Sequence, residues 1–247
     1  MRVMHSHTLI GRLAARALGW LAVLLSGAAQ AAAPGITGPT FDLVASAAQI
    51  SQPDGAAIYS WGYGCNTAPA GYAPAAITNP GCGRMQLPGP TLIVTEGQMV
   101  TVTLHNALPP AAGNTSILFP GMDVTPSGGV PGLLTQEAAI GGTVSYSFTA
   151  RQPGTHAYHS GTQSDLQVEM GLYGALIVLP AATPAACDNA VMATAQSANR
   201  GSGIPPDFRL AKAAFNHPSA CYDREYLFQF SEIDPLIHAQ AQEQVAA

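Results

Sequence analysis

The sequence of 247 residues has few charged side chains, which make up 9% of it, and Lys212 is its only lysine. Asp and Glu outnumber Lys and Arg by 14 to 9, for a formal net charge of −5. A surface of this sign repels the phosphates of nucleic acids and the headgroups of anionic lipids. We therefore expect neither a nucleic acid nor a membrane surface as a partner.

The sequence also has no apolar run of the roughly 20 residues that a membrane span needs. Residues 1–33 instead combine three early arginines, an apolar run over residues 17–29 and an Ala-rich end, the pattern of a secretory signal. We expect this signal to be removed on export to the periplasm or out of the cell, and an uncleaved anchor is the alternative. Its loss would leave 6 basic and 14 acidic residues, a charge of −8.

A C-x-x-C motif is absent as well, so the cysteine spacing does not indicate a structural zinc site. All 4 cysteines follow the signal, which favours disulfides in an oxidising compartment. Three pairings are open. We predict Cys65–Cys82 and Cys187–Cys221, because each of these closes a local loop.

Helical periodicity is scarce, and alternation with a period of two dominates. Val100, Val102 and Leu104 alternate with polar residues, residues 143–149 repeat the pattern, and residues 174–180 form a continuous apolar run. Such segments, separated by Gly and Pro, predict an all-β sandwich or barrel.

Three segments differ from this pattern. Residues 54–90 are rich in Gly, Pro and Ala and predict a long irregular loop, and residues 181–222 are typical of a connector. In "REYLFQFSEID", residues 226–230 alternate again and predict one more strand, followed by a short polar tail.

Three ordered motifs carry a resemblance: "PGPTLIVTEGQMVTVTLHNALP", "NTSILFPG" and "GTHAYHSG…GLYGALIVLP". Together they resemble the first cupredoxin (plastocyanin-like) domain of the multicopper oxidase family. The resemblance implies a cupredoxin-like Greek-key β-sandwich over residues 34–180, joined by the connector over residues 181–222. It also implies that residues 223–247 start an incomplete second cupredoxin domain with an extra strand.

The same resemblance implies a copper site. Family members oxidise a substrate at a type 1 copper and reduce dioxygen at a trinuclear cluster, to which the first domain gives two His-x-His pairs. Alternate residues of a strand share a face, so both imidazoles of a pair project together. Here Leu118 and Pro120 stand at the first pair, and His159 and Gly161 at the second. Three of the four expected ligands are therefore lost.

No other residues are expected to replace them. His156 lies three residues before His159, so a regular strand turns the two side chains to opposite faces unless a bulge re-aims one. A lone imidazole binds copper weakly. The His-Cys-His segment of a type 1 site is missing, and His217, four residues before Cys221, is interpreted as an incidental loop residue beside a disulfide.

These features favour an exported, multicopper-oxidase-like protein without a complete copper site of its own, inactive as an oxidase when alone. One alternative is a laccase-like copper oxidoreductase completed by self-association or by a partner chain with further cupredoxin domains. Another is a non-catalytic assembly module, in which the strand around residues 226–230 pairs with the edge of a partner's sheet.

Overall fold

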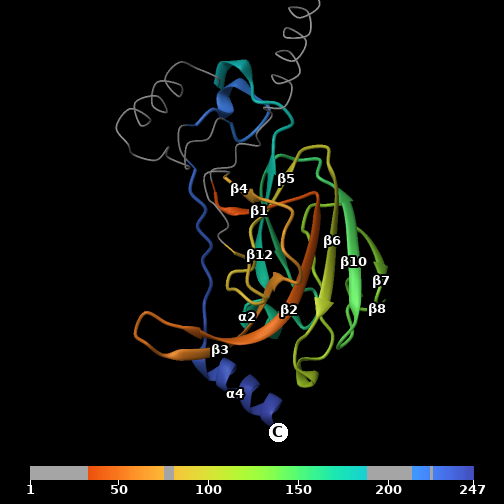
Figure 1. Cartoon of the computed structure of the whole chain (residues 1–247), viewed down its shortest axis with the longest axis vertical. Coiled ribbons are helices and arrows are strands. Elements are labelled where there is room, and N and C mark those ends of the chain that lie inside the picture. The colour runs from red at the N-terminus through yellow and green to blue at the C-terminus, as the bar shows by residue number, and fades with distance from the viewer. Residues whose placement is uncertain (1–32, 75–80, 188–212, 223–224) are drawn as a thin grey trace, which may run out of the picture.

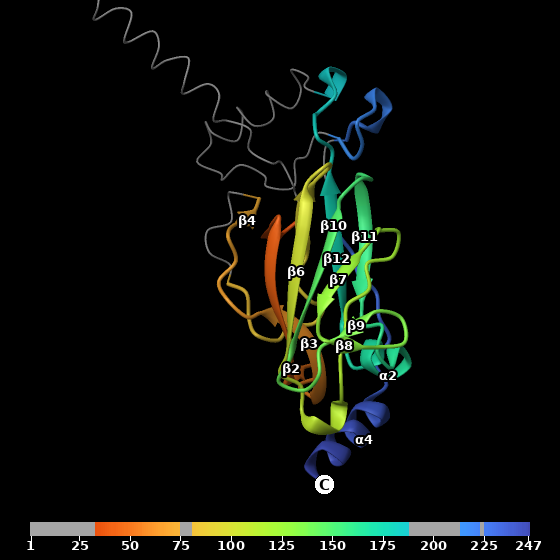
Figure 2. The same cartoon turned by 90° about the vertical axis from the view of Figure 1, so that its right-hand side faces the viewer.

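The protein is a sandwich of two five-stranded β-sheets, seen in a computed structural model that describes residues 33–74, 81–187, 213–222 and 225–247 (Figures 1 and 2). The strands are β1 (Gly35–Thr37), β2 (Thr40–Ser51), β3 (Ala57–Cys65), β4 (Tyr72–Ala73), β5 (Leu92–Thr95), β6 (Met99–Asn106), β7 (Thr125–Gly128), β8 (Val130–Pro131), β9 (Gln136–Glu137), β10 (Thr143–Thr149), β11 (Gly154–His159) and β12 (Tyr173–Leu179). The helices are η1 (Pro110–Ala112), α2 (Ser164–Glu169), η2 (Ala185–Cys187), η3 (Pro218–Ala220) and α4 (Pro235–Ala246).

Neighbouring strands in each sheet often lie far apart in sequence. The first sheet has the order β11-β12-β5-β1-β4 and the second β3-β2-β6-β10-β7, while β8 and β9 form a separate hairpin. β5 runs parallel to both β1 and β12, and β2 runs parallel to β6. The chain thus crosses between the sheets repeatedly, which confirms the predicted sandwich.

The predicted alternation places side chains on two faces. Val100, Val102 and Leu104 of β6 are buried between the sheets opposite apolar partners on β10. On the outer face, the hydroxyl groups of Thr103 and Ser145 lie 3.1 Å apart and hydrogen-bond. β12 is buried on both faces, as its continuous apolar sequence predicts.

The prediction of a long loop over residues 54–90 is wrong for β3 and for the short strand β4. β3 contains glycines because another segment crosses it closely. A Cβ atom on Gly62 would lie 2.4 Å from the carbonyl oxygen of Gln86, and one on Gly64 only 2.2 Å from that of Gly83. The loop-like composition therefore reflects close backbone approach within a strand.

Two glycines near β12, Gly174 and Gly89, have a similar cause, a buried tyrosine. Tyr158 is fully buried, and its hydroxyl donates to the carbonyl of Pro90 at 2.6 Å. A Cβ atom on Gly174 would lie 2.4 Å from the ring, and one on Gly89 would lie 2.7 Å from the hydroxyl oxygen. Glycine at both positions therefore makes room for the buried ring.

The predicted extra strand near the C-terminus does not form. Residues 225–234, the C-terminal strap, are extended but pair with no strand of the described residues. Leu227 packs on a cluster that includes Ile93 and Ile177, which lie on the outer face of the first sheet. The strap thus lies across that face and not at an edge, so its backbone cannot join the ladder.

The polar tail that follows is a helix, α4, which the sequence analysis missed. Asp234 accepts a hydrogen bond from the backbone N–H of Leu236 at 2.8 Å, and Pro235 occupies the first turn. These are ordinary signals of a helix start. Whether residues 223–247 begin a second domain stays a prediction.

Two other predictions fall largely outside the described residues. The signal over residues 1–33 lies there except for Ala33, and so do residues 188–212 of the connector. The described ends of the connector carry η2 and η3, joined by the Cys187–Cys221 disulfide. A search of the described ranges for a helix that could span a membrane finds none.

Candidate metal centre

The structure brings the two segments that carry the expected copper ligands directly side by side. Leu118 and His159 form an isolated antiparallel bridge, with backbone N–H to carbonyl distances of 2.8 Å and 3.2 Å. Gly161 lies two residues beyond His159 and is buried, while Pro120 is exposed. Three of the four positions aligned by sequence resemblance, Leu118, His159 and Gly161, are therefore neighbours in the fold.

At the centre of these positions, an aliphatic side chain fills the space that a ligand would need. A Cβ atom on Gly161 would lie 2.7 Å from Cγ of Leu118 and 2.9 Å from its Cδ1. Both distances are shorter than van der Waals contact, so residue 161 fits beside Leu118 only as a glycine. Leucine, proline and glycine side chains offer no electron pair, and the residues present here do not fit a copper cluster.

His159 is the one imidazole among these positions. Its Nδ1 lies 3.0 Å from the carbonyl oxygen of Ser160, which can only accept, so Nδ1 carries the proton. Nε2 is then the basic nitrogen. His156 uses its own Nε2 to contact the carbonyl of Gln152 at 3.0 Å.

The two histidines do not converge. In β11 they pair with different residues of β12, His156 with Leu176 and His159 with Tyr173, three positions apart. In the described part of the chain, no group of three or more His, Cys, Asp or Glu side chains is arranged to hold a metal ion.

The cysteines offer no thiolate for a type 1 copper. Both predicted disulfides are present, Cys65–Cys82 and Cys187–Cys221, and together they use all 4 cysteines of the sequence. His217 accepts a hydrogen bond from the backbone N–H of Ser219 at 3.1 Å and thereby caps η3.

Beneath the candidate ligand positions lies a buried polar network that the sequence analysis missed. Oε1 of Gln167 in α2 accepts hydrogen bonds from the hydroxyl groups of Thr115 (2.9 Å) and Ser160 (2.6 Å). Nε2 of Gln167 donates to the carbonyl of Asn114 at 2.7 Å. One amide side chain thus joins the segment before Leu118 to the segment after His159.

A second branch of this network contains a carboxylate. Thr162 donates to Oε1 of Glu137 at 2.8 Å, and its hydroxyl also lies 2.8 Å from that of Ser116. Asn114 donates to the other carboxylate oxygen at 3.1 Å. Because buried polar groups are costly without partners, these contacts fix both segments independently of any metal.

Three buried tyrosines hold the same region from the core. Tyr63 donates to the carbonyl of Ser116 at 2.6 Å, and Tyr146 to that of Gln136 at 2.7 Å. Burial raises the pKa of Tyr63, Tyr146 and Tyr158 well above that of an ordinary phenol. They therefore act as permanent hydrogen-bond donors and not as acid–base groups near neutral pH.

Comparison with known proteins points to one family. The sequence profile described as multicopper oxidase matches residues 82–183, which include both segments of the candidate centre. Multicopper oxidase CTB12 of Cercospora beticola is 40% identical over 95 residues, covering 37% of this chain and 14% of that protein. Copper resistance protein A of Pseudomonas syringae pv. tomato is 41% identical over 93 residues, with coverage of 37% and 14%.

Among solved structures, a multicopper oxidase from Pseudomonas thermotolerans has 24% identity and a TM-score of 0.46, covering 61% of this chain and 31% of that one. The matched part of the chain spans about a seventh of the curated relatives, whose coverage is 14%. Over residues 82–183 the chain matches the multicopper oxidase profile, and in this part it is similar to members of that family.

Proposed function

We propose that this is an exported protein with a multicopper-oxidase-type cupredoxin domain over residues 34–180, which alone holds neither a type 1 copper nor a trinuclear cluster. One contact carries this proposal, the packing of Leu118 against Gly161. It places carbon where the family resemblance requires two imidazole nitrogens, and Pro120 removes a third.

His159 alone does not compensate for these losses. A single imidazole gives copper one nitrogen ligand, and tight sites in proteins combine several donors in a fixed geometry. Because all 4 cysteines lie in disulfides, a thiolate for a type 1 copper is not available either. The oxidase activity of the longer relatives would therefore need ligands from elsewhere.

Export is supported by two observations. The start of the sequence follows the pattern of a secretory signal, and the two disulfides suit the periplasm or the outside of the cell.

Copper counting tests the proposal. Purified full chain is loaded with excess Cu(II), desalted to remove free metal, and measured for copper per chain and for visible absorption. We expect copper well below one ion per chain and no intense blue band. Tight stoichiometric copper, with or without that band, would refute the proposal.

A triple variant provides the matched control. Leu118→His, Pro120→His and Gly161→His together place imidazoles at all three of these positions. The variant is expected to retain more copper than the unmodified chain. Adding His159→Ala to the triple variant should lower that copper again.

The exposed aromatic residues of the C-terminal strap favour a second role, assembly. Tyr226, Phe228 and Phe230 stack in a row with ring centroids 6.3 Å and 6.4 Å apart, and Phe228 and Phe230 are 71% and 92% exposed. Contact between two copies of the chain would bury this apolar surface. Light scattering tests this: a dimer that Phe228→Ser and Phe230→Ser dissociate supports it, and a strict monomer at high concentration refutes it.

A further inference from the structure

The docking of α4 depends on few apolar contacts. The helix lies beside β3 and η1 at one end of the sandwich (Figures 1 and 2). Its buried residues are Ala241 and His238, and Val245 packs against the core in part, while Leu236 is 71% exposed. Burial of so little apolar surface stabilises docking weakly, and a 12-residue helix is marginal by itself.

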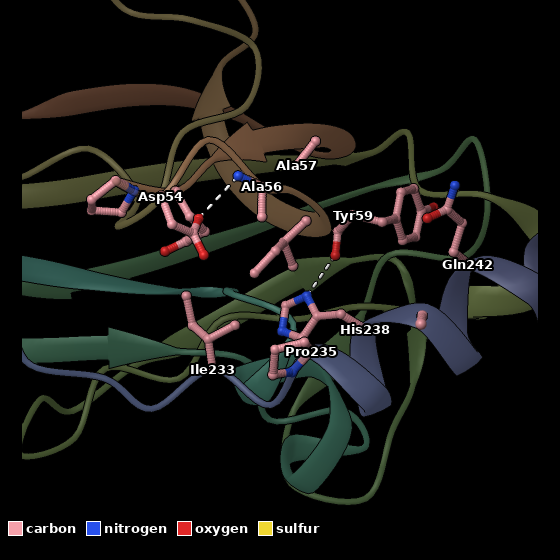
Figure 3. Close-up of a pocket in the computed structure, with 12 residues that line it drawn as sticks. Asp54, Ala56, Ala57, Tyr59, Ile233, Pro235, His238 and Gln242 are labelled. Atoms are coloured by element: carbon pink, nitrogen blue, oxygen red, sulfur yellow. Dashed lines mark hydrogen bonds between the residues drawn. The ribbon is translucent and has the colours of Figure 1, made fainter.

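His238 makes the polar contacts that attach the helix. Its ring is 1% exposed and lies between β3 and the end of α2. Nδ1 faces the carbonyl oxygen of Tyr59, as Figure 3 shows, and Nε2 lies 3.1 Å from the carbonyl oxygen of Glu169. The hydroxyl of Ser60 also lies 3.3 Å from Nδ1.

These contacts distinguish between the two protonation states of the ring. A backbone carbonyl only accepts, whereas a neutral imidazole carries a single N–H and the imidazolium carries two. The neutral ring therefore leaves one nitrogen lone pair against a carbonyl oxygen. Only the imidazolium donates to both Tyr59 and Glu169.

The charged groups around the ring are acidic. The Glu169 carboxylate on α2 lies 3.7 Å from Nε2 and also accepts from the backbone N–H of Asp234 at 2.6 Å. The Asp234 side chain, on the strap, caps α4, and Asp54 on the β2–β3 turn lines the same cleft of about 550 Å³. Glu243, on α4 itself, is exposed.

One further titratable group, a phenol, lies nearby. The phenol of Tyr59, on β3, accepts from the indole N–H of Trp61 at 3.2 Å. Among the described residues that line the cleft, none is lysine or arginine. The charged groups described around the ring are therefore all carboxylates.

We propose that His238 is a proton-dependent latch that holds α4 against the edge of β3. Docked, the ring needs an N–H on both nitrogens to donate to both carbonyls, whereas the released helix has no such requirement. Docking is thus strongest at a pH low enough to supply the imidazolium and weakens as the pH rises. Release uncovers the carbonyl of Tyr59, a backbone acceptor at the open edge of the second sheet.

Hydrogen exchange of the full chain tests the latch. Protection of amides in residues 235–246, corrected for the intrinsic rate, is compared between about pH 5.5 and about pH 8, on either side of the imidazole range. We expect protection to fall about five- to tenfold on going to the higher pH, the equivalent of one buried hydrogen bond. His238→Gln, which cannot titrate, should abolish the dependence, and Glu169→Gln should reduce it.

His156→Gln is the matched control, because His156 lies on β11 and contacts only the Gln152 carbonyl in the described structure. It should retain the full pH dependence. Protection that does not change with pH, or that changes equally in His238→Gln, would overturn the proposal.

A second measurement needs no substitution. Nitrogen chemical shifts of the His238 ring report how many of its nitrogens are protonated. Two N–H groups at about pH 5.5, with α4 protected, would support the latch, since this pH lies below the ordinary imidazole range. A single N–H under the same conditions would overturn it, even if the His238→Gln variant fails to fold.

Discussion

Replacing Gly161 by alanine is expected to destabilise the protein through a collision with one side chain. The new Cβ would lie 2.7 Å from Cγ of Leu118. Backbone strain does not contribute, because Gly161 is not among the glycines with a positive φ. The effect thus isolates the packing of two positions that the family resemblance assigns to copper.

The magnitude follows from how easily Leu118 can yield. Overpacking a core costs about 1–3 kcal/mol. Leu118 is half-buried and its colliding atoms end a flexible side chain, so we expect the lower part of that range, about 1–2 kcal/mol. Leu118→Ala alone should cost about 1–2 kcal/mol, below the values for fully buried leucines.

The double variant distinguishes this explanation from a general loss of stability. Once Leu118→Ala removes the colliding atoms, Gly161→Ala should cost little more, so the two effects should fall short of additivity by about 1 kcal/mol. The free energy of unfolding is measured by urea denaturation of all four proteins. Additivity within about 0.3 kcal/mol would refute the packing explanation.

Other predictions rest on single contacts. Gly64→Ala should cost more than Gly161→Ala, and exceed about 3 kcal/mol, because its Cβ would meet backbone and not a flexible side chain; urea denaturation measures this. Tyr158→Phe should cost about 1–3 kcal/mol in the same assay, because the buried carbonyl of Pro90 loses its donor, and an unchanged midpoint would contradict this. Removing the Cys65–Cys82 disulfide by a double serine substitution should cost about 3 kcal/mol, since it closes a loop across 17 positions, and an unchanged unfolding free energy would argue against that.

The sequence predicts the parts of the fold in which side-chain alternation decides the structure. β6 and β10 follow from alternation alone, and the two disulfides follow from the separation of the cysteines. The sequence does not predict β3, because Gly62 and Gly64 do not form a turn. They allow the backbone of a neighbouring segment to pass close to the strand. Composition cannot distinguish these two uses of glycine.

The C-terminal region was predicted poorly for a different reason. The side chains of the strap do alternate, since Leu227 faces the sandwich while Phe228 and Phe230 face outward. Such alternation occurs in any extended segment and does not require a hydrogen-bonded neighbouring strand. In α4, the cap at Asp234 was a readable signal. The role of His238 was not readable, because its partner Tyr59 lies 179 positions away.

The candidate metal centre shows how two segments are held together without side chains from the expected ligand positions. Segments that carry Leu118 and His159 are joined by two backbone hydrogen bonds, and Gln167 connects the residues on either side of them. None of these contacts involves a ligand side chain. They therefore all form with leucine and glycine at these positions, and the aliphatic contact fills the space between the segments. Selection for folding alone would preserve the bridge and the network, so retention of this geometry is no evidence that copper binds there.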